Sequence, residues 1–574
     1  SEQGIMRFWI ALLVFVTGLV SSAIGFVNQL ENQPIDVINA SGSLSEPVSY
    51  VLIPNSVLTA YEGEASAFAI GDGPVFMSTG RESDIVAWLG DSKYVELRLS
   101  VNVVDEIVSL AEIQRPGTGE LVDPTGADIW RTEDSSNGKL LLPFEIDNEV
   151  AILLASTGLD LAPRTVRISW DLGDVEAPVA PITLIGLWVT ILGALMGVYA
   201  AIVYFRKYRS RRQKRGPKRP KPIKSKRVFS QAGAKPPTGR RAHRTMGFIS
   251  ALGAVSLLTG CVPNYDNPIV SPQALEQLDG LTASMTNDQL SRVLRDIALV
   301  VAAADAQLDR ESLEVRVAGP ALDMRRAAYG LAGKTAAADD GPAPILAGPV
   351  QLFLPSATDS WPRSALVVTG QTTLQALVLL QESPRDEYKL YQYSDLLPDI
   401  RFPEVPASST GANSLKYDNK FLVISPPSLV EGLGNLLNAG AASPWSILID
   451  PDNTYVSDVS SVQFGLQETL SNANLNFSHE LSENPAVILA NSEGGALVAL
   501  YMIDTYTIIP KEPGDAVAIT GDEATLLGTG GSATGIETQY GAMLLFNVPA
   551  SGSEDRATLL GATQQLLSAI SLGG

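Results

Sequence analysis

The chain has 574 residues, with 41 Lys and Arg against 62 Asp and Glu, and a formal net charge of −21. At roughly 150 residues per domain, this length predicts several structural units. The acidic balance argues against a nucleic-acid-binding protein. One Cys and two His (His243 and His479) exclude a disulfide framework, a Cys₂His₂ zinc site, an iron–sulfur cluster and a two-histidine carboxylate metal site. We therefore assign no metal and no cofactor.

The first long apolar run is residues 8–27, which contain no charged side chain. At 1.5 Å of rise per residue, a helix of this length matches the hydrocarbon thickness of a bilayer. The sequence predicts a transmembrane helix within residues 1–30. A cleavable signal peptide is the alternative, because small residues (Ser21, Ser22 and Ala23) stand where a peptidase could cut.

A second uncharged run, residues 181–205, predicts another transmembrane helix. Gly193 and Gly197 form a G-x-x-x-G pair, and Gly186 lies two turns earlier on nearly the same face. Such a groove lets a partner helix approach closely, either from this chain or from a second copy in a homo-oligomer. The alternative is that glycine is simply common in membrane helices.

The tract at residues 206–245 is strongly basic. It holds 17 of the 41 basic residues and no acidic residue, so the rest of the chain has 24 basic residues against 62 acidic ones. Such charges resist export and are attracted to anionic lipid, which predicts a disordered cytosolic loop that contacts membrane lipids. The tract lacks the interleaved aromatic residues that stack on bases, so no nucleic-acid partner is expected.

The most specific motif follows directly. Arg240, Arg241 and Arg244 precede a short apolar core at residues 246–258. This core ends in Leu258, Thr259, Gly260 and Cys261, and the pattern resembles the bacterial lipoprotein signal. The resemblance implies diacylglycerol on the Cys261 thiol and cleavage after Gly260. Its internal position is unusual, and the alternative is a chance match within a third membrane helix.

Residues between the two helices have the pattern of an all-β domain. Apolar and polar side chains alternate with the period of a half-buried strand, and Gly, Pro, Asn and Asp separate the runs. Seven short strands predict a sandwich-like fold. One helix is expected at residues 84–89, with Ser83 as its N-cap. The expected strands are residues 50–53, 67–70, 75–78, 95–99, 139–142, 151–154 and 166–171.

The part after Cys261 predicts two α+β units. A capping box at Thr286 and Gln289 opens an amphipathic helix. A strand at residues 313–317, a helix at 321–331 and paired strands at 373–381 and 387–394 follow. Later strands near 475–480, 487–490, 497–509 and 541–548 precede a predicted helix at 554–570. This order of elements resembles the tandem cone-shaped folds of the NTF2-like or cystatin-like class.

Candidate chemistry is sparse. Asp450 and Asp452 flank Pro451 after an apolar stretch, as in the metal-binding Asp-x-Asp of many glycosyltransferases, but Pro451 and Asn453 also predict a simple turn. The segment fails as a calcium loop because Tyr455 stands where glycine is required. The glycines at residues 528–535 lack the lysine of a phosphate loop. His479 alternates with apolar residues along a strand and is expected to be packed. No catalytic residue is assigned.

The whole layout, together with residues 50–89 (including STGRESDIVAWLG), resembles a group of actinobacterial envelope membrane proteins that are often labelled glycosyltransferases. The resemblance implies a monoderm or mycolate-type cell envelope. We expect a multi-pass membrane protein that is noncatalytic and binds an envelope ligand or protein partner outside the membrane. The alternative is a glycosyltransferase or another enzyme of envelope glycan or lipid assembly. The predicted parts are 1–30, 31–178, 179–205, 206–245, 246–261, 262–410 and 411–574.

Overall fold

The computed structural model describes residues 2–31, 37–102, 107–145, 147–172, 181–210, 280–334 and 341–573. Contacts divide the chain into two units. The first contains helices α1 (Glu2–Glu31) and α4 (Pro181–Ser210). The second contains the described residues of 39–102, 107–170 and 280–573.

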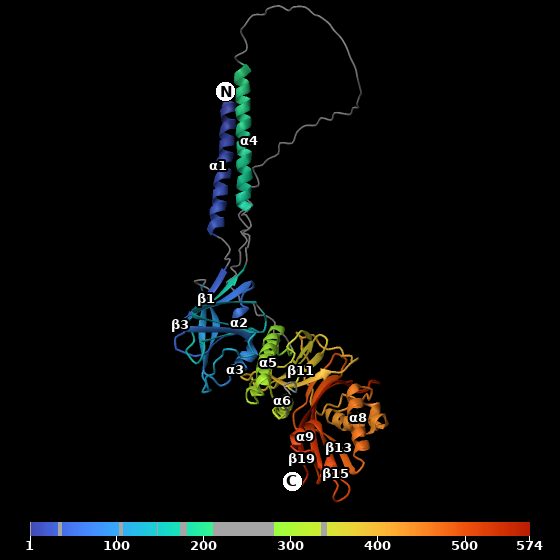
Figure 1. The fold of residues 1–574 in the computed structure, drawn as a ribbon. Coiled ribbons are helices and arrows are strands. Elements are labelled where there is room, and N and C mark those ends of the chain that lie inside the picture. Colours follow the sequence, from blue (N-terminus) through green and yellow to red (C-terminus); the bar gives the residue numbers. More distant parts are fainter. Residues whose placement is uncertain are drawn as a thin grey trace, which may run out of the picture. The chain divides into compact units, whose positions relative to one another are not determined.

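Helices α1 and α4 pack side by side (Figure 1). Each contains a stretch that is long and apolar enough to cross a membrane, Ile5–Val27 and Ile182–Arg206. Large apolar side chains point outward: Leu13 is 69% exposed and Trp188 is 71% exposed. Exposed apolar side chains around a helix are typical of a surface that contacts lipid.

The strands before α4 form a barrel, which corrects the predicted sandwich. The sheet order is β6-β3-β7-β2-β4-β5-β1-β8, and β3 also pairs with β8. This pairing closes seven strands into a ring, with β6 added to β3. The bounds are β1 (Val37–Ser43), β2 (Val51–Ile53), β3 (Glu64–Arg81), β4 (Tyr94–Asn102), β5 (Ile107–Arg115), β6 (Thr132–Phe144), β7 (Val150–Ala155) and β8 (Thr165–Asp171).

The length of β3 explains the difference. The sequence predicts separate strands at residues 67–70 and 75–78, but both belong to this one strand of 18 residues, with a register irregularity between Ile70 and Pro74. A strand this long has room to pair with β6, β7 and β8 in turn. Alternation along a strand shows which side chains face the core but not whether the sheet closes.

Two short helices, α2 (Asn55–Leu58) and α3 (Glu82–Leu89), accompany the barrel. The predicted N-cap of α3 is wrong, because Arg81 rather than Ser83 occupies that position and no side chain caps the helix. Beside α3, Trp88 packs on Tyr50 and on Trp130, with ring centroids 5.4 and 5.5 Å apart. Barrel and helix therefore share one aromatic core.

The remaining chain forms helices around one large sheet. The helices are α5 (Asn287–Gln307), α6 (Gly319–Ala332), α7 (Pro426–Ala439), α8 (Thr454–Thr469) and α9 (Gly521–Leu527), with short 3₁₀ turns at Ser312–Val315, Gly440–Ala442 and Pro444–Ile447. The strands are β9 (Val350–Pro355), β10 (Arg363–Gly370), β11 (Leu374–Gln381), β12 (Lys389–Leu396), β13 (Ala473–Leu481), β14 (Val487–Ala490), β15 (Ala496–Pro510), β16 (Val517–Ala518), β17 (Gly531–Ser532), β18 (Ile536–Val548) and β19 (Thr558–Ser571).

Two separate α+β units are not observed. The order β13-β15-β18-β19-β12-β11-β10-β9, with β14 on β15, makes one nine-stranded sheet among the described residues. Its two halves join where β12 pairs with β19, at Asp395 with Ala562 and Leu396 with Gly561. This junction pairs residues that are far apart in the sequence, so no local sequence pattern predicts it.

Local predictions in this part have mixed outcomes. The capping box is confirmed, since the Gln289 amide donates to Thr286 Oγ1 and the Thr286 amide donates to Gln289 Oε1. The predicted strand at 313–317 is instead a 3₁₀ turn. The predicted helix at 554–570 is wrong, because it is strand β19. Pairs of adjacent apolar residues recur seven positions apart in this segment, a spacing that is also typical of a helix. In the structure the segment is a strand with buried residues on both faces.

Candidate functional site

A hollow of 590 Å³ lies between α6, α9 and the strands β15 and β19. Leu526 and Leu567 contribute apolar surface, and Ile503 and Leu567 also pack against the neighbouring core. The hollow therefore combines an apolar wall with polar side chains, as ligand sites do. The lining residues are Arg310, Asp323, Arg326, Ala327, Gly330, Lys334, Ser482, Asn484, Tyr501, Ile503, Leu526 and Leu567.

Tyr501 is the buried polar residue of this hollow. Its side chain is 2% exposed, and its hydroxyl has no hydrogen-bond partner among the described residues. Burial raises the pKa of the Tyr501 phenol, and the charge of Asp323 adds to the rise. The hydroxyl therefore stays protonated at neutral pH and is a free donor. A buried donor without a partner is costly, so a ligand that opened the wall of the hollow beside Gly541 and accepted this bond would gain by it.

Cationic side chains surround the same hollow. Arg310 and Lys334 line it, and Lys334 Nζ donates to the Leu526 carbonyl at 3.1 Å. Arg326 lines it too, and pairs with Glu314. Desolvation raises the pKa of Asp323 above 3.8, although the charge of Arg326 opposes the rise. With three cations against the one acid Asp323, the lining of this hollow carries a net positive charge.

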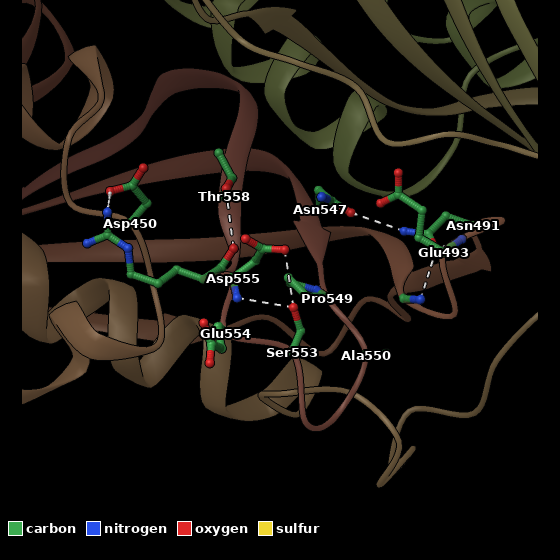
Figure 2. Close-up of a pocket in the computed structure, with 12 residues that line it drawn as sticks. Asp450, Asn491, Glu493, Asn547, Pro549, Ala550, Ser553, Glu554, Asp555 and Thr558 are labelled. Carbon is green, nitrogen blue, oxygen red and sulfur yellow. Dashed lines mark hydrogen bonds and ion pairs between the residues drawn. The ribbon is translucent and has the colours of Figure 1, made fainter.

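A second hollow, of 680 Å³, lies at the end of strands β15 and β18 and is strongly acidic. Figure 2 shows its polar residues, with Asp450 and Glu493 at opposite sides of the view. Its side chains bind one another: Asn491 donates to Asn547 at 3.2 Å, and Ser553 donates to Asp555 at 3.2 Å. Among the described residues, no group of three His, Cys, Asp or Glu could hold a metal ion.

Asp450 and Asp452 lie beside this second hollow in a turn. Asp450 forms an ion pair with Arg556 at 2.7 Å, and its Oδ1 accepts from the Asp452 amide. Asn453 then caps α8 by accepting a hydrogen bond from the Val456 amide at 2.9 Å. The geometry matches the turn interpretation of the Asp-x-Asp, and Asn453 begins the helix that follows the turn.

His479 lies on β13 and is almost completely buried. Its Nδ1 is 2.6 Å from Asp504 Oδ1, and its side chain is 2% exposed. The other ring nitrogen is 3.4 Å from Gln463 and 3.3 Å from Asn438. Asp504 also accepts from Gln564 at 2.8 Å. The imidazole is thus held by polar side chains of α7, α8 and β15, as expected for a packed histidine.

The glycine-rich stretch at residues 528–535 connects helix α9 to strand β18. Gly528 ends α9 with φ at 77°, and Gly531 belongs to β17. A glycine in this left-handed conformation is the usual end of a helix.

Gly186 and Gly193 lie on the face of α4 that contacts α1. A Cβ at Gly186 would lie 2.4 Å from the Ser22 amide nitrogen, and one at Gly193 would lie 2.5 Å from that of Phe15. A Cβ at Gly197 would have no atom within 4 Å. The lipobox of Leu258, Thr259, Gly260 and Cys261 lies outside the described residues.

Both hollows belong to the part of the chain that a family comparison matches. Residues 282–571, half of the chain, match the Domain of unknown function (DUF8094). The chain belongs to the DUF8094 family. No curated protein and no solved structure matches the chain. The DUF8094 domain therefore contains α5 and the whole nine-stranded sheet.

Sequence reasoning missed the hollow of the DUF8094 domain beside α6. Arg310 and Lys334 flank α6 in the sequence, whereas Tyr501 lies far along the chain within an apolar strand. A tyrosine in such a strand looks like an ordinary core residue. The unpaired hydroxyl can be recognised only when the fold brings residues of α6 and β15 to the wall of one hollow.

Proposed function

We propose that this protein is a noncatalytic, membrane-anchored binding protein whose DUF8094 domain captures a small anionic molecule with an apolar part. The observation that carries the proposal is a hollow that presents Arg310, Lys334 and apolar side chains, with the unpaired Tyr501 hydroxyl buried in its wall. Cations attract the anionic group, the phenol donates to one of its oxygens, and the apolar wall covers the remainder.

The setting of the proposal comes from the sequence and the two apolar helices. The basic tract at residues 206–245 favours a cytosolic loop, so the barrel and the DUF8094 domain would lie outside the membrane. The resemblance to actinobacterial envelope proteins supports a cell-envelope location and an envelope molecule as the ligand. The side chains that a glycosyltransferase would need at Asp450 and Asp452 contribute to a turn and an ion pair.

Phenyl phosphate is a suitable probe, because it joins an anion to an apolar ring. We would titrate it into the full chain in nanodiscs of neutral phosphatidylcholine and measure binding by calorimetry. Inorganic phosphate and phenol test the anionic and apolar parts separately. We expect saturable binding of phenyl phosphate that is tighter than binding of either fragment. Absence of saturable binding for all three would contradict the proposal.

Tyr501→Phe separates ligand binding from stability. Loss of the phenol should weaken phenyl phosphate binding about tenfold or more, since a hydrogen bond to a charged group contributes roughly 1.5–3 kcal/mol. The free protein should be at least as stable as wild type, because the buried hydroxyl has no partner among the described residues. A purely structural role for Tyr501 would instead lower the thermal midpoint and leave affinity unchanged.

Charge variants complete the test. Arg310→Ala and Lys334→Ala should each weaken binding, while Arg295→Ala, at a 62% exposed arginine of α5, is the matched control. The double variant Asp450→Asn, Asp452→Asn should bind like wild type. Loss of envelope function in that double variant, with normal folding and with rescue dependent on a divalent metal, would favour the transferase instead.

A further inference from the structure

The barrel and the DUF8094 domain share a buried ionic centre at Asp84 of α3. Arg81 donates to its carboxylate at 3.1 and 2.9 Å, and Arg363 of β10 donates at 2.9 and 2.6 Å. Asp84 is 2% exposed, Arg363 1% and Arg81 5%. Arg81 also reaches the DUF8094 domain, donating to the Thr358 carbonyl at 2.9 Å. Both guanidinium groups are thus paired with the buried carboxylate, although Arg363 Nε has no hydrogen-bond partner among the described residues.

A second ionic contact repeats this arrangement. Asp128, from the barrel segment, is 6% exposed and accepts from Arg316 at 2.5 Å. The same carboxylate accepts from the Tyr388 amide at 2.7 Å. Both acids therefore come from the segment before α4, and Arg316 and Arg363 come from the DUF8094 domain.

Backbone carbonyls of the barrel segment also accept hydrogen bonds from side chains of the DUF8094 domain. Arg385 donates to the carbonyls of Trp88 at 2.8 Å and Leu89 at 3.2 Å, and its guanidinium lies 5.4 Å from the Trp88 ring. Gln289, the residue that completes the capping box of α5, donates through Nε2 to the carbonyls of Asp128 and Ile129 at 3.1 and 3.0 Å. Each contact satisfies a group that would otherwise lose its solvent.

The apolar cores meet at the same place. Trp361 of the DUF8094 domain packs against the aromatic core of the barrel, and the Arg363 guanidinium lies 3.6 Å from the Trp361 ring centroid. Separating the two domains would expose this ring, and would leave Arg363 without its carboxylate. Both changes favour the associated state.

We propose that the barrel and the DUF8094 domain form a noncovalent complex that persists when the chain between them is cut. The contacts join residues before position 131 to residues after position 280, so every covalent link between them runs through residues that include Cys261. Cleavage after Gly260 would thus not release the DUF8094 domain. The barrel holds it, and through the barrel segment it stays linked to the helices α1 and α4, with or without an acyl chain.

The test uses the full chain with a protease site inserted between Ser230 and Gln231 and an affinity tag at the N-terminus. After cleavage of the purified protein in detergent, we expect both fragments to elute together from the affinity and size-exclusion columns. Separate elution of two folded fragments would overturn the proposal. Fluorescence and circular dichroism of each fragment report whether it is folded.

Interface variants decide which contacts hold the fragments. Asp84→Ala leaves the buried Arg363 without a carboxylate and leaves Arg81 only the exposed Asp359, so the fragment affinity should fall roughly 100-fold or more. Arg385→Ala removes only contacts to the other domain and should weaken association while each fragment remains folded. Arg98→Ala is the control, because this 57% exposed arginine pairs with Glu96 within the barrel. Equal retention of all three variants would exclude the ionic centre as the cause.

Discussion

Asp84 shows how a single carboxylate organises a contact between domains. Burial by itself would raise its pKa, but hydrogen bonds from Arg363 and the charges of Arg81 and Arg363 outweigh that effect and hold the pKa below 3.8. For Arg81, burial opposes its charged form, and the carboxylate of Asp84 more than compensates, which raises its pKa. Each charge therefore depends on the other for its burial.

This dependence predicts how stability varies with pH. Because the folded pKa of Asp84 is lowered, its contribution is present above about 3.8 and is lost as the pH falls towards the folded value. Asp84→Asn should lower the free energy of unfolding by about 3–5 kcal/mol at neutral pH. The difference from wild type should shrink below pH 3.8. Urea unfolding followed by tryptophan fluorescence measures both curves.

Asp359 provides the matched control for this residue. It also pairs with Arg81, at 3.2 Å, but its side chain is 52% exposed. Exposed ion pairs contribute about 0–1 kcal/mol, so Asp359→Asn should leave the unfolding free energy nearly unchanged. A difference between Asp84→Asn and wild type that stays constant down to pH 2 would contradict the assignment.

At the scale of elements, small residues determine how α1 meets α4. They recur at three-and-four spacing on both contacting faces: Gly18, Ser22 and Gly25 in α1, and Thr183, Gly186, Thr190 and Gly193 in α4. Partner positions run in opposite directions, since Gly18 meets Thr190 and Gly25 meets Thr183. Such a close approach through small residues is typical of helices that pack in lipid, where no hydrophobic driving force acts between them.

Leucine at two glycines of α4 should have opposite outcomes. Gly193→Leu places a side chain where a Cβ already lies 2.5 Å from the Phe15 amide nitrogen, so we expect separation of α1 and α4 and a destabilisation of about 1–3 kcal/mol. Gly197→Leu is the control, because its Cβ meets no atom within 4 Å. Thermal loss of the helical circular dichroism signal in detergent compares them. Equal midpoints would contradict this packing.

At the scale of the whole molecule, membrane topology and processing can be tested together. The basic tract predicts that Lys214 is inside and that Asp72 and Asp452 are outside. Single cysteines at these positions, in a Cys261→Ala background, should react with an impermeant reagent only at the two outer sites. Labelling at position 214 in intact cells would overturn the topology.

The lipobox predicts two polypeptides from the natural chain and one from Cys261→Ala. Immunoblotting with antibodies to the barrel and to the DUF8094 domain distinguishes the two forms. A single full-length band in both proteins would contradict cleavage. The proposed association of the two domains does not require this cleavage. The experiment with the inserted protease site therefore tests the ionic centre separately.

The two long apolar helices and the α5 capping box could be predicted because each depends on neighbours in the sequence. Uncharged runs at residues 8–27 and 181–205 match the two helical stretches that are long and apolar enough to cross a membrane, and Thr286 and Gln289 interact across one helical turn. The turn at Asp450 followed from Pro451 and Asn453 for the same reason. Short-range sterics and solvation decide such features without help from distant residues.

Barrel closure, the single nine-stranded sheet and the hollow at Tyr501 required tertiary structure. The pairing of β3 with β8 and of β12 with β19 joins segments whose own patterns allow several partners. The burial of Asp84 beside Arg363 likewise depends on two segments 279 positions apart. A sequence determines by itself what each segment can form, but the partner of a buried charge or strand edge is decided only when the folded chain removes water from both.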